Sequence, residues 1–479
     1  MSSSHAPLAA LVAVVAAACA TNPATGSRQL MLISESQEIA MGRDYDQEVT
    51  ASIGLYPDTA LQRWIQQFGA RLAATSERPN LPWSFRVVDD PVVNAFALPG
   101  GYIYVTRGIL AHLNSEAELA GVVGHEIGHV TARHSVSQMS KQQLAQIGLA
   151  VGTIASPEFE RFAGLASAGL GVLFLKYSRD AERQADDLGL RYMRRVSYDP
   201  REMPHVFEML TRVSQAQGGG RVPEWLATHP DPENRRGRIE QEIAGLPQNV
   251  SGVAVNRDAY LQRLDGLVFG NNPRDGYFKE NQFFHPDLRF RMTFPQGWTT
   301  SNAKQSVVAT SPEKDAAVEL AVAKQQTADA AAQVFLSQRG FTSGYPVRTS
   351  VGGLSAVSAA FAAVTENGTL RGTALFVEHG GAVYRLVGYA AEARWPAVQT
   401  VAERALQSFA RLTDPVVLAV EPQRVDIVRL DQRTTIEAMA RRRPSPVSAA
   451  TLALVNQVEP ETALDPGRLV KWIVGQPLP

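Results

Sequence analysis

One cysteine, Cys19, is all that the 479-residue sequence contains. A disulfide framework and a cysteine-ligated metal site are therefore excluded, and any metal must be held by His, Asp and Glu side chains. An excess of charge of one sign is also missing, because 46 basic and 47 acidic residues give a formal net charge of -1. No long run of like charges occurs beyond Arg441, Arg442 and Arg443. Nucleic acid is therefore not an expected partner.

A hydrophobic run long enough to span a bilayer is missing as well. Residues 8–18 form a shorter run of small and apolar side chains, which suits the core of a signal peptide and ends at Cys19. The stretch "VAAACAT" resembles a lipoprotein processing site, which predicts a signal peptide over residues 1–19 and an acylated Cys19. Plain secretion, or a buried cysteine in an N-terminal helix, is the alternative.

A chain of this length predicts about three domains. Residues 30–265 are expected to form a mainly helical domain with a small sheet, because helical periodicity surrounds the strand-like stretches "WSFRVVDD" and "GYIYVT". After the turn "NPRDG", strands and one helix predict a small α+β domain over residues 280–413. Residues 420–476 follow as a very small unit with the order strand, helix, helix, strand. The predicted fold class is therefore α+β and multidomain.

The stretch "GVVGHEIGHVTARH" carries two histidines four residues apart, in a segment with the capping pattern and apolar stripe of a helix. On a helix, His125 and His129 lie on nearly the same face, one turn apart, where both imidazoles can reach one ion. Glu126 points to the side of this pair and can hold a water without being a ligand, as a general base requires. The alternative is a solvated helix face whose histidines bind no metal.

Zinc held by two histidines needs a third protein ligand, and a catalytic site keeps one position open for water. His134 is out of register for that ligand by one residue. The segment "YSRDAERQADDLGLRY" offers Glu182, with Asp186 one turn later on the same face, placed to accept the other N–H of a ligand histidine. In the alternative reading, Glu182 belongs to a surface run of charged residues.

Taken together, "HEIGHVTARH", "SRDAERQAD" and the upstream "NAFALPGG" resemble the HtpX and CAAX-prenyl-protease superfamily of gluzincin peptidases, in particular its soluble periplasmic, BepA-like branch. The resemblance covers about residues 34–246. It implies a zincin-type metallopeptidase domain that binds one Zn2+ through His125, His129 and Glu182. Glu126 is then the general base, and Asp186 orients a ligand histidine from behind.

The same resemblance implies further site residues outside these two segments. It predicts an edge strand that pairs with the substrate backbone, formed by Asn94, Ala95 and Phe96. The stretch "THPDPENR" matches a motif of the branch and gives His229 and Arg235 an active-site role. For His229 two roles are open: blocking the open zinc position in the resting enzyme, or donating a hydrogen bond to the oxyanion together with Arg235. The apolar residues 144–175 look like a shortened lid.

Downstream, the likeness to other modules is looser. The middle domain vaguely resembles PsbP-like α+β domains. Residues 420–476 resemble a LysM module on the strength of "TTIEAMARR", "LALVNQV" and "LDPGRLVKWIV", although Arg433 and Thr434 stand where the usual Gly-Asp pair would be. A LysM module implies peptidoglycan as a partner.

The expected function is a zinc-dependent endopeptidase of the bacterial cell envelope. It would reside in the periplasm, anchored to the outer membrane through a lipid on Cys19, and hydrolyse misfolded or unassembled envelope proteins. Two alternatives stay open: an assembly factor or chaperone with a latent zinc site, and a binding protein tethered to peptidoglycan by its C-terminal unit.

Overall fold

The computed structural model describes residues 19–148, 176–216, 228–229, 232–246, 253–365 and 368–477. They form two compact units. The first contains the residues up to Gly270 together with Gln423–Gly475, and the second contains Asn271–Pro422. The expected signal peptide up to residue 18 and residues 149–175 of the expected lid lie outside the described residues. Within the described part of the chain, no helix is both long and apolar enough to cross a membrane.

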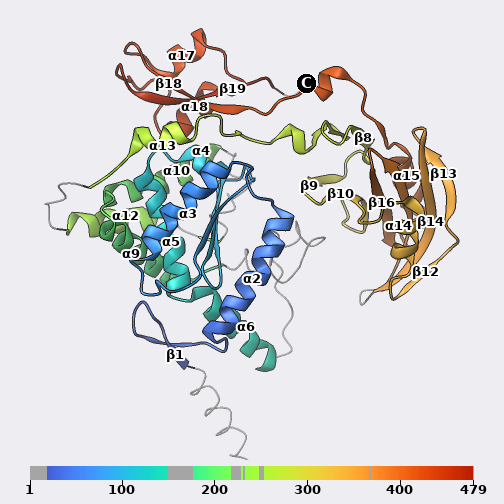
Figure 1. The fold of residues 1–479 in the computed structure, drawn as a ribbon, viewed down its shortest axis with the longest axis horizontal. Coiled ribbons are helices and arrows are strands. Elements are labelled where there is room, and N and C mark those ends of the chain that lie inside the picture. Colours follow the sequence, from blue (N-terminus) through green and yellow to red (C-terminus); the bar gives the residue numbers. More distant parts are fainter. Residues whose placement is uncertain are drawn as a thin grey trace, which may run out of the picture. The chain divides into compact units, whose positions relative to one another are not determined.

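A three-stranded sheet lies in the first unit, as the two strand-like stretches predict (Figure 1). Strand β5 (Tyr102–Thr106) is central, with β3 (Ser84–Val88) parallel on one side and β4 (Ala95–Leu98) antiparallel on the other. β4 is therefore an edge strand of this sheet, and its four residues are buried. A short hairpin of β1 (Cys19–Thr21) and β2 (Arg28–Leu30) precedes these strands in the sequence.

Helices make up most of the first unit. In chain order they are α2 (Glu35–Ser52), α3 (Thr59–Ala73), α4 (Arg107–His112), α5 (Glu116–Thr131), α6 (His134–Gly148), α9 (Arg179–Arg195), the 3-10 turn η1 (Pro200–Glu202), α10 (Met203–Ala216), α12 (Pro232–Ala244) and α13 (Arg257–Arg263). The expected capping box at Ser34 and Gln37 is present at the start of α2, and the hydroxyl of Ser115 caps α5 by accepting from the amide of Glu118. These local signals were readable because a cap depends on only a few adjacent residues.

Helix α5 is buried along its whole length, with every residue from Glu116 to Thr131 shielded from solvent. Its close neighbour is α9, and small residues on both helices let their backbones approach. A Cβ atom added to Gly189 would lie 2.9 Å from the backbone nitrogen of His125, and one added to Gly124 would lie 3.1 Å from the Cα of Gly189. Glycine is required at such a contact because any side chain would push the helices apart. The short spacing brings side chains of both helices to one point.

The C-terminal segment has the expected order: β18 (Arg424–Arg429), α17 (Ile436–Arg442), α18 (Ala449–Val455) and β19 (Leu469–Val474). It is not a unit of its own, however. Its apolar side chains, among them Trp472 and Ile473, belong to the same core as the helices of the first unit. The segment therefore shares the core of the first unit, and a shared core depends on contacts between distant parts of the chain that a local sequence pattern does not show.

A buried lysine and a neighbouring glutamine join this segment to the end of α4 and to α5, the helix that carries the histidine motif. The ammonium group of Lys471 is fully buried and donates to the carbonyl oxygens of Ala111 and Leu113, each 2.7 Å away. Beside it, the amide of Gln457 donates to Glu118 of α5 at 2.9 Å. Burial raises the pKa of Glu118 to about 7 and lowers that of Lys471 to about 7. Buried polar groups of this kind fix one packing arrangement because each needs its partner.

The second unit is the expected α+β domain, and it begins earlier than residue 280. An eight-stranded sheet has the order β12-β14-β15-β16-β11-β10-β9 with β13 also paired to β14, and a four-stranded sheet has the order β17-β8-β7-β6. The elements are η2 (Pro273–Asp275), β6 (Tyr277–Lys279), β7 (Gln282–His285), β8 (Phe290–Thr293), β9 (Thr299–Asn302), β10 (Ser306–Thr310), β11 (Ala316–Val322), α14 (Ala328–Leu336), β12 (Phe341–Ser343), β13 (Val347–Val351), β14 (Leu354–Thr365), β15 (Gly368–His379), β16 (Ala382–Ala391), α15 (Trp395–Gln407), β17 (Ala410–Arg411) and α16 (Pro415–Leu418). The "HGG" hairpin is confirmed, because Gly380 and Gly381 connect β15 to β16 with φ angles of 59° and 81°.

Candidate metal centre

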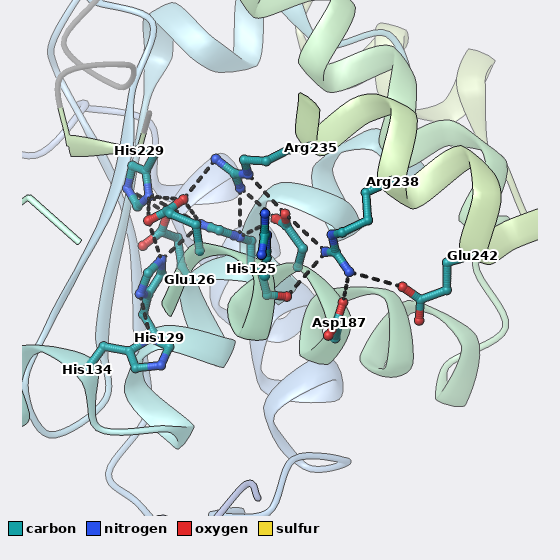
Figure 2. Close-up of polar contacts among 12 residues, drawn as sticks. His125, Glu126, His129, His134, Asp187, His229, Arg235, Arg238 and Glu242 are labelled. Atoms are coloured by element: carbon teal, nitrogen blue, oxygen red, sulfur yellow. Dashed lines mark hydrogen bonds and ion pairs between the residues drawn. The ribbon is translucent and has the colours of Figure 1, made fainter. Parts of the chain in front are cut away.

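Four side chains converge between α5, α9 and the segment before α12. His125 and His129 come from α5, Glu182 from the first turn of α9, and His229 from the two described residues that precede α12. All four are buried, with relative exposures of 1–2%. Figure 2 shows His125, His129 and His229 pointing toward one another.

The donor atoms of this cluster have the spacing of a tetrahedral site. From His125 Nε2, the distances are 3.0 Å to His129 Nε2, 3.2 Å to His229 Nδ1 and 3.6 Å to Glu182 Oε2. Glu182 Oε1 lies 3.4 Å from His129 Nε2 and 3.1 Å from His229 Nδ1. A tetrahedron with metal–nitrogen distances of about 2.0–2.1 Å has edges of about 3.3 Å. The residues therefore fit a zinc ion, and the donor set of three imidazoles and one carboxylate suits that metal.

Burial determines the charge state of the two helix histidines. It lowers the pKa of His125 and lowers that of His129 well below the usual range, so both imidazoles are neutral. Neutral imidazole is the form that binds a metal, because a ring nitrogen must offer its lone pair. For Glu182, burial alone would raise the pKa, but the charge of His229 and hydrogen bonds from His129 and His229 hold it well below its usual range.

Behind His125 lies a carboxylate that is itself held by an arginine. Asp186 Oδ1 is 2.9 Å from His125 Nδ1, the position expected for a group that fixes the tautomer of a ligand. The guanidinium of Arg235 donates to both oxygens of Asp186, at 2.9 Å and 2.6 Å, and lies 2.8 Å from Glu182. Although burial would raise the pKa of Asp186, the charge of Arg235 and its hydrogen bonds lower it.

This arrangement favours a positioning role for Arg235 over the oxyanion contact considered from the sequence. The guanidinium faces the two carboxylates and also stacks over the ring of Phe207 at 4.8 Å. A second arginine, Arg238, lies farther from the histidines, as Figure 2 shows, and contacts Asp187 and Glu242. Both arginines lie on α12, so this helix supports the site through ion pairs with α9.

Glu126 lies next to the cluster without belonging to the four-donor set. Its side chain is 1% exposed, and its Oε1 atom has no hydrogen-bond partner among the described residues. Burial raises the pKa of Glu126 to about 7. His229 Nε2 is 3.6 Å from this oxygen, and the charges of Glu182 and Glu126 raise the pKa of His229 although burial alone would lower it. A carboxyl group with a pKa near neutral can take up and release a proton at physiological pH.

Two residues at the cluster were not assigned to the site from the sequence. His134 was rejected as a ligand, yet its Nδ1 is 2.9 Å from His129 Nδ1 and its Nε2 is 2.7 Å from Gln184. Tyr177 stacks on His129 with ring centroids 4.0 Å apart and bonds Ser135 through its hydroxyl at 2.7 Å. Each of the two residues lies at the end of a recognised motif stretch, and this closeness in the sequence was the only signal that could have identified it.

The remaining predicted site residues are not members of the four-donor set. Ala95 and Phe96 are in edge strand β4, and Asn94 immediately precedes it. The Oδ1 atom of Asn94 is buried and has no hydrogen-bond partner in the described part of the chain. Cys19 begins the N-terminal hairpin, where it pairs with Leu30. Its acylation stays a prediction.

Comparison with solved structures returns weak likenesses. The solution structure of cyanobacterial PsbP (CyanoP) from Synechocystis sp. PCC 6803 is 14% identical, covers 27% of this chain and 91% of its own, and has a TM-score of 0.24. The crystal structure of LpqN from Mycobacterium tuberculosis is 12% identical, covers 26% of this chain and 83% of its own, and has a TM-score of 0.20. Scores this low support no inference about function.

Sequence comparison gives stronger matches. The beta-barrel assembly-enhancing protease of Escherichia coli (strain K12) is 33% identical over 268 residues, which are 53% of each chain. The mitochondrial metalloendopeptidase OMA1 of Arabidopsis thaliana is 36% identical over 186 residues, 37% of this chain and 36% of the relative. The chain thus spans about half, or less, of the length of these relatives. The model of peptidase family M48 matches residues 59–243. These residues include all four side chains of the candidate metal cluster, and over them this chain is similar to peptidase family M48.

Proposed function

We propose that this protein is a zinc-dependent endopeptidase that hydrolyses misfolded or unassembled proteins of the bacterial cell envelope. The observation that carries the proposal is the buried tetrahedral set of His125, His129, Glu182 and His229, with the carboxyl group of Glu126 beside it. The match to peptidase family M48 and to relatives described as proteases and metalloendopeptidases supports the same activity.

His125, His129 and Glu182 would hold the ion. Zinc in such a site supplies a Lewis acid that polarises the scissile carbonyl and lowers the pKa of a water. Glu126 takes a proton from the water as its oxygen adds to the carbonyl carbon, and then delivers that proton to the amine nitrogen as the C–N bond breaks. Its burial suits both steps, because burial raises the pKa of this carboxyl and so opposes the lowering that a bound cation would cause.

His229 keeps the resting protein latent in this account. Its Nδ1 atom occupies the fourth corner of the tetrahedron, which is the position that a catalytic zinc site leaves for water. Movement of the segment that carries His229 would open this corner. The same geometry favours, as the second candidate function, a non-proteolytic assembly factor that never leaves the latent state.

Substrate binding at β4 is part of the proposal. The strand is an edge of its sheet, and an extended peptide can add to such an edge through backbone hydrogen bonds. Recognition through the backbone reads little side-chain identity, which suits unfolded polypeptides as substrates.

Location and cell-wall contact are predictions that rest on the sequence. We expect the protein in the periplasm, attached to the outer membrane through an acyl group on Cys19. Peptidoglycan binding by residues 420–476 calls for sedimentation of the full chain with the polymer. Truncation before this segment is unsuitable, because Trp472 and its apolar neighbours fill the core of the first unit.

The activity is tested by digestion of casein with the zinc-loaded protein and with Glu126→Gln. We expect the variant to retain zinc and to lose hydrolysis, because the amide cannot accept the water proton. An equal rate in both proteins would overturn the role of Glu126. Biological activity that survives in Glu126→Gln would favour the assembly factor instead.

A further inference from the structure

The N-terminal hairpin is linked to the metal-facing histidine His129 by a continuous line of side-chain contacts. Asn22, between β1 and β2, donates from Nδ2 to Gln184 Oε1 at 3.3 Å. Gln184 Oε1 lies 2.7 Å from His134 Nε2, and His134 Nδ1 lies 2.9 Å from His129 Nδ1. Asn22 and His134 are buried, with relative exposures of 2% and 7%. No charged group takes part in this line.

Backbone groups fix the direction of every hydrogen bond in the line. The amide N–H of Ala24 can only donate, and it meets Asn22 Oδ1 at 2.8 Å. The other end of the Asn22 side chain is therefore its NH2 group, which donates to Gln184. On the far side, Gln29 donates from Nε2 to the carbonyl oxygen of Ala132 at 2.8 Å and presents Oε1 to Asn22 at 3.3 Å. Both contacts select the same orientation of the Asn22 amide.

These hydrogen-bond directions determine which nitrogen of His129 carries its proton. Because Gln184 presents its oxygen, the Nε2 atom of His134 must carry the proton, and in a neutral ring Nδ1 is then an acceptor. His129 must therefore donate from Nδ1, which leaves the lone pair on its Nε2 atom. That atom faces the other donors of the cluster.

We propose that Asn22, Gln184 and His134 are positioning residues that hold His129 in its metal-binding tautomer. This inference rests on the proposed zinc function. His125 is oriented by the charged pair of Asp186 and Arg235, whereas His129 is oriented by neutral groups that begin in the hairpin after Cys19. Loss of an orienting contact behind a ligand lowers metal affinity by about 10- to 100-fold.

The decisive variant is Asn22→Asp. It reverses the donor and acceptor roles along the line of contacts and keeps a side chain at every position of the line. An aspartate keeps the acceptor for Ala24 but presents a second acceptor to Gln184, so the Gln184 amide must turn its NH2 group toward Asp and His134. His134 Nε2 would then accept, Nδ1 would donate, and His129 would carry its proton on Nε2. We expect zinc affinity, measured by competition with a chelator, to fall by about 10- to 100-fold and below that of Asn22→Ala.

A second pair of variants tests the same line of contacts at Gln184, a half-buried residue of α9. Gln184→Glu still accepts from both neighbours and should bind zinc as tightly as the native chain, while Gln184→Ala should lose affinity. Thr25→Ala is the matched control, because the Thr25 hydroxyl contacts only the hairpin residue Ser27 among the described residues. It should leave zinc affinity unchanged.

Native zinc affinity in a folded Asn22→Asp protein, or equal affinities in Gln184→Glu and Gln184→Ala, would overturn the inference. Failure of the native chain to bind zinc would overturn the proposed function itself. The two failures are therefore distinguishable, because the first requires a native chain that binds the metal.

Discussion

The Nδ1 atom of His229 lies 3.2 Å from the Nε2 atom of His125, and so a third histidine completes the set of donors provided by α5 and α9. A three-ligand zinc site keeps an open position, and in the proposed function His229 would fill it and hold the resting protein latent. The alternative role, donation to the oxyanion, gives the opposite result when His229 is removed.

Removal of that imidazole should therefore activate the protein. We expect His229→Ala to raise casein hydrolysis by about tenfold if the open form of the native chain is about one-tenth populated. Zinc content should remain near one ion per chain, because three ligands suffice. A fall in rate of about 100- to 1000-fold with unchanged zinc would instead identify His229 as an oxyanion donor.

Glu182 is predicted to be the third ligand. In the His229→Ala background, Glu182→Ala should remove most of the bound zinc, as His125→Ala and His129→Ala should, because only two ligands then remain. Asp180→Ala is the matched control: it lies on the same helix, its side chain is exposed to solvent, and it is not a member of the four-donor set. Metal analysis after dialysis distinguishes them, and retained zinc in Glu182→Ala would show that another group is the ligand.

Asp186 should influence the metal through His125. Asp186→Asn is expected to lower zinc affinity by about 10- to 100-fold. Hydrolysis at saturating zinc should change far less, because the reacting groups are untouched. Affinity is measured by chelator competition at constant pH. Unchanged affinity would remove Asp186 from the support of the site.

Activity should depend on the protonation of Glu126. Burial raises the pKa of this carboxyl to about 7, and a bound cation would lower it, so hydrolysis should fall as the pH drops through a value at or below about 7. The sign follows because only the carboxylate form can accept the proton of the water. Bound zinc must be measured at each pH. A decline that parallels zinc release would assign the pH dependence to the ligands instead.

Lys471 should stabilise the first unit. Lys471→Met leaves two buried carbonyl oxygens without their donor and Glu118 without a nearby cation, so we expect a loss of about 3–5 kcal/mol in the free energy of unfolding. Arg468→Met, on the exposed end of the same strand pair, should change stability by less than about 0.5 kcal/mol. Urea unfolding followed together with zinc release tests both. Equal stability of the two variants would argue against a shared core.

The features that could be predicted from the sequence are those formed by residues close together in the chain. The cap at Ser34, the turn at Gly380 and the histidine pair one helical turn apart are all local patterns. The packing of β18 and β19 into the first unit was not predictable, because it depends on Lys471 meeting carbonyl groups 360 and 358 residues earlier. The contact of His134 with His129 was not predictable for a related reason: His134 also contacts Gln184 of α9, and the two residues meet only when the helices pack together.

The most direct test of the account is zinc-edge X-ray absorption on the purified full chain, combined with metal analysis. We predict about one zinc ion per chain, coordinated by three imidazole nitrogens and carboxylate oxygen in the native protein. In His229→Ala the spectrum should show two imidazoles, with an added oxygen from water. A native protein without zinc, or a native site with the same number of imidazoles as His229→Ala, would contradict the four-donor centre from which the proposed latency follows.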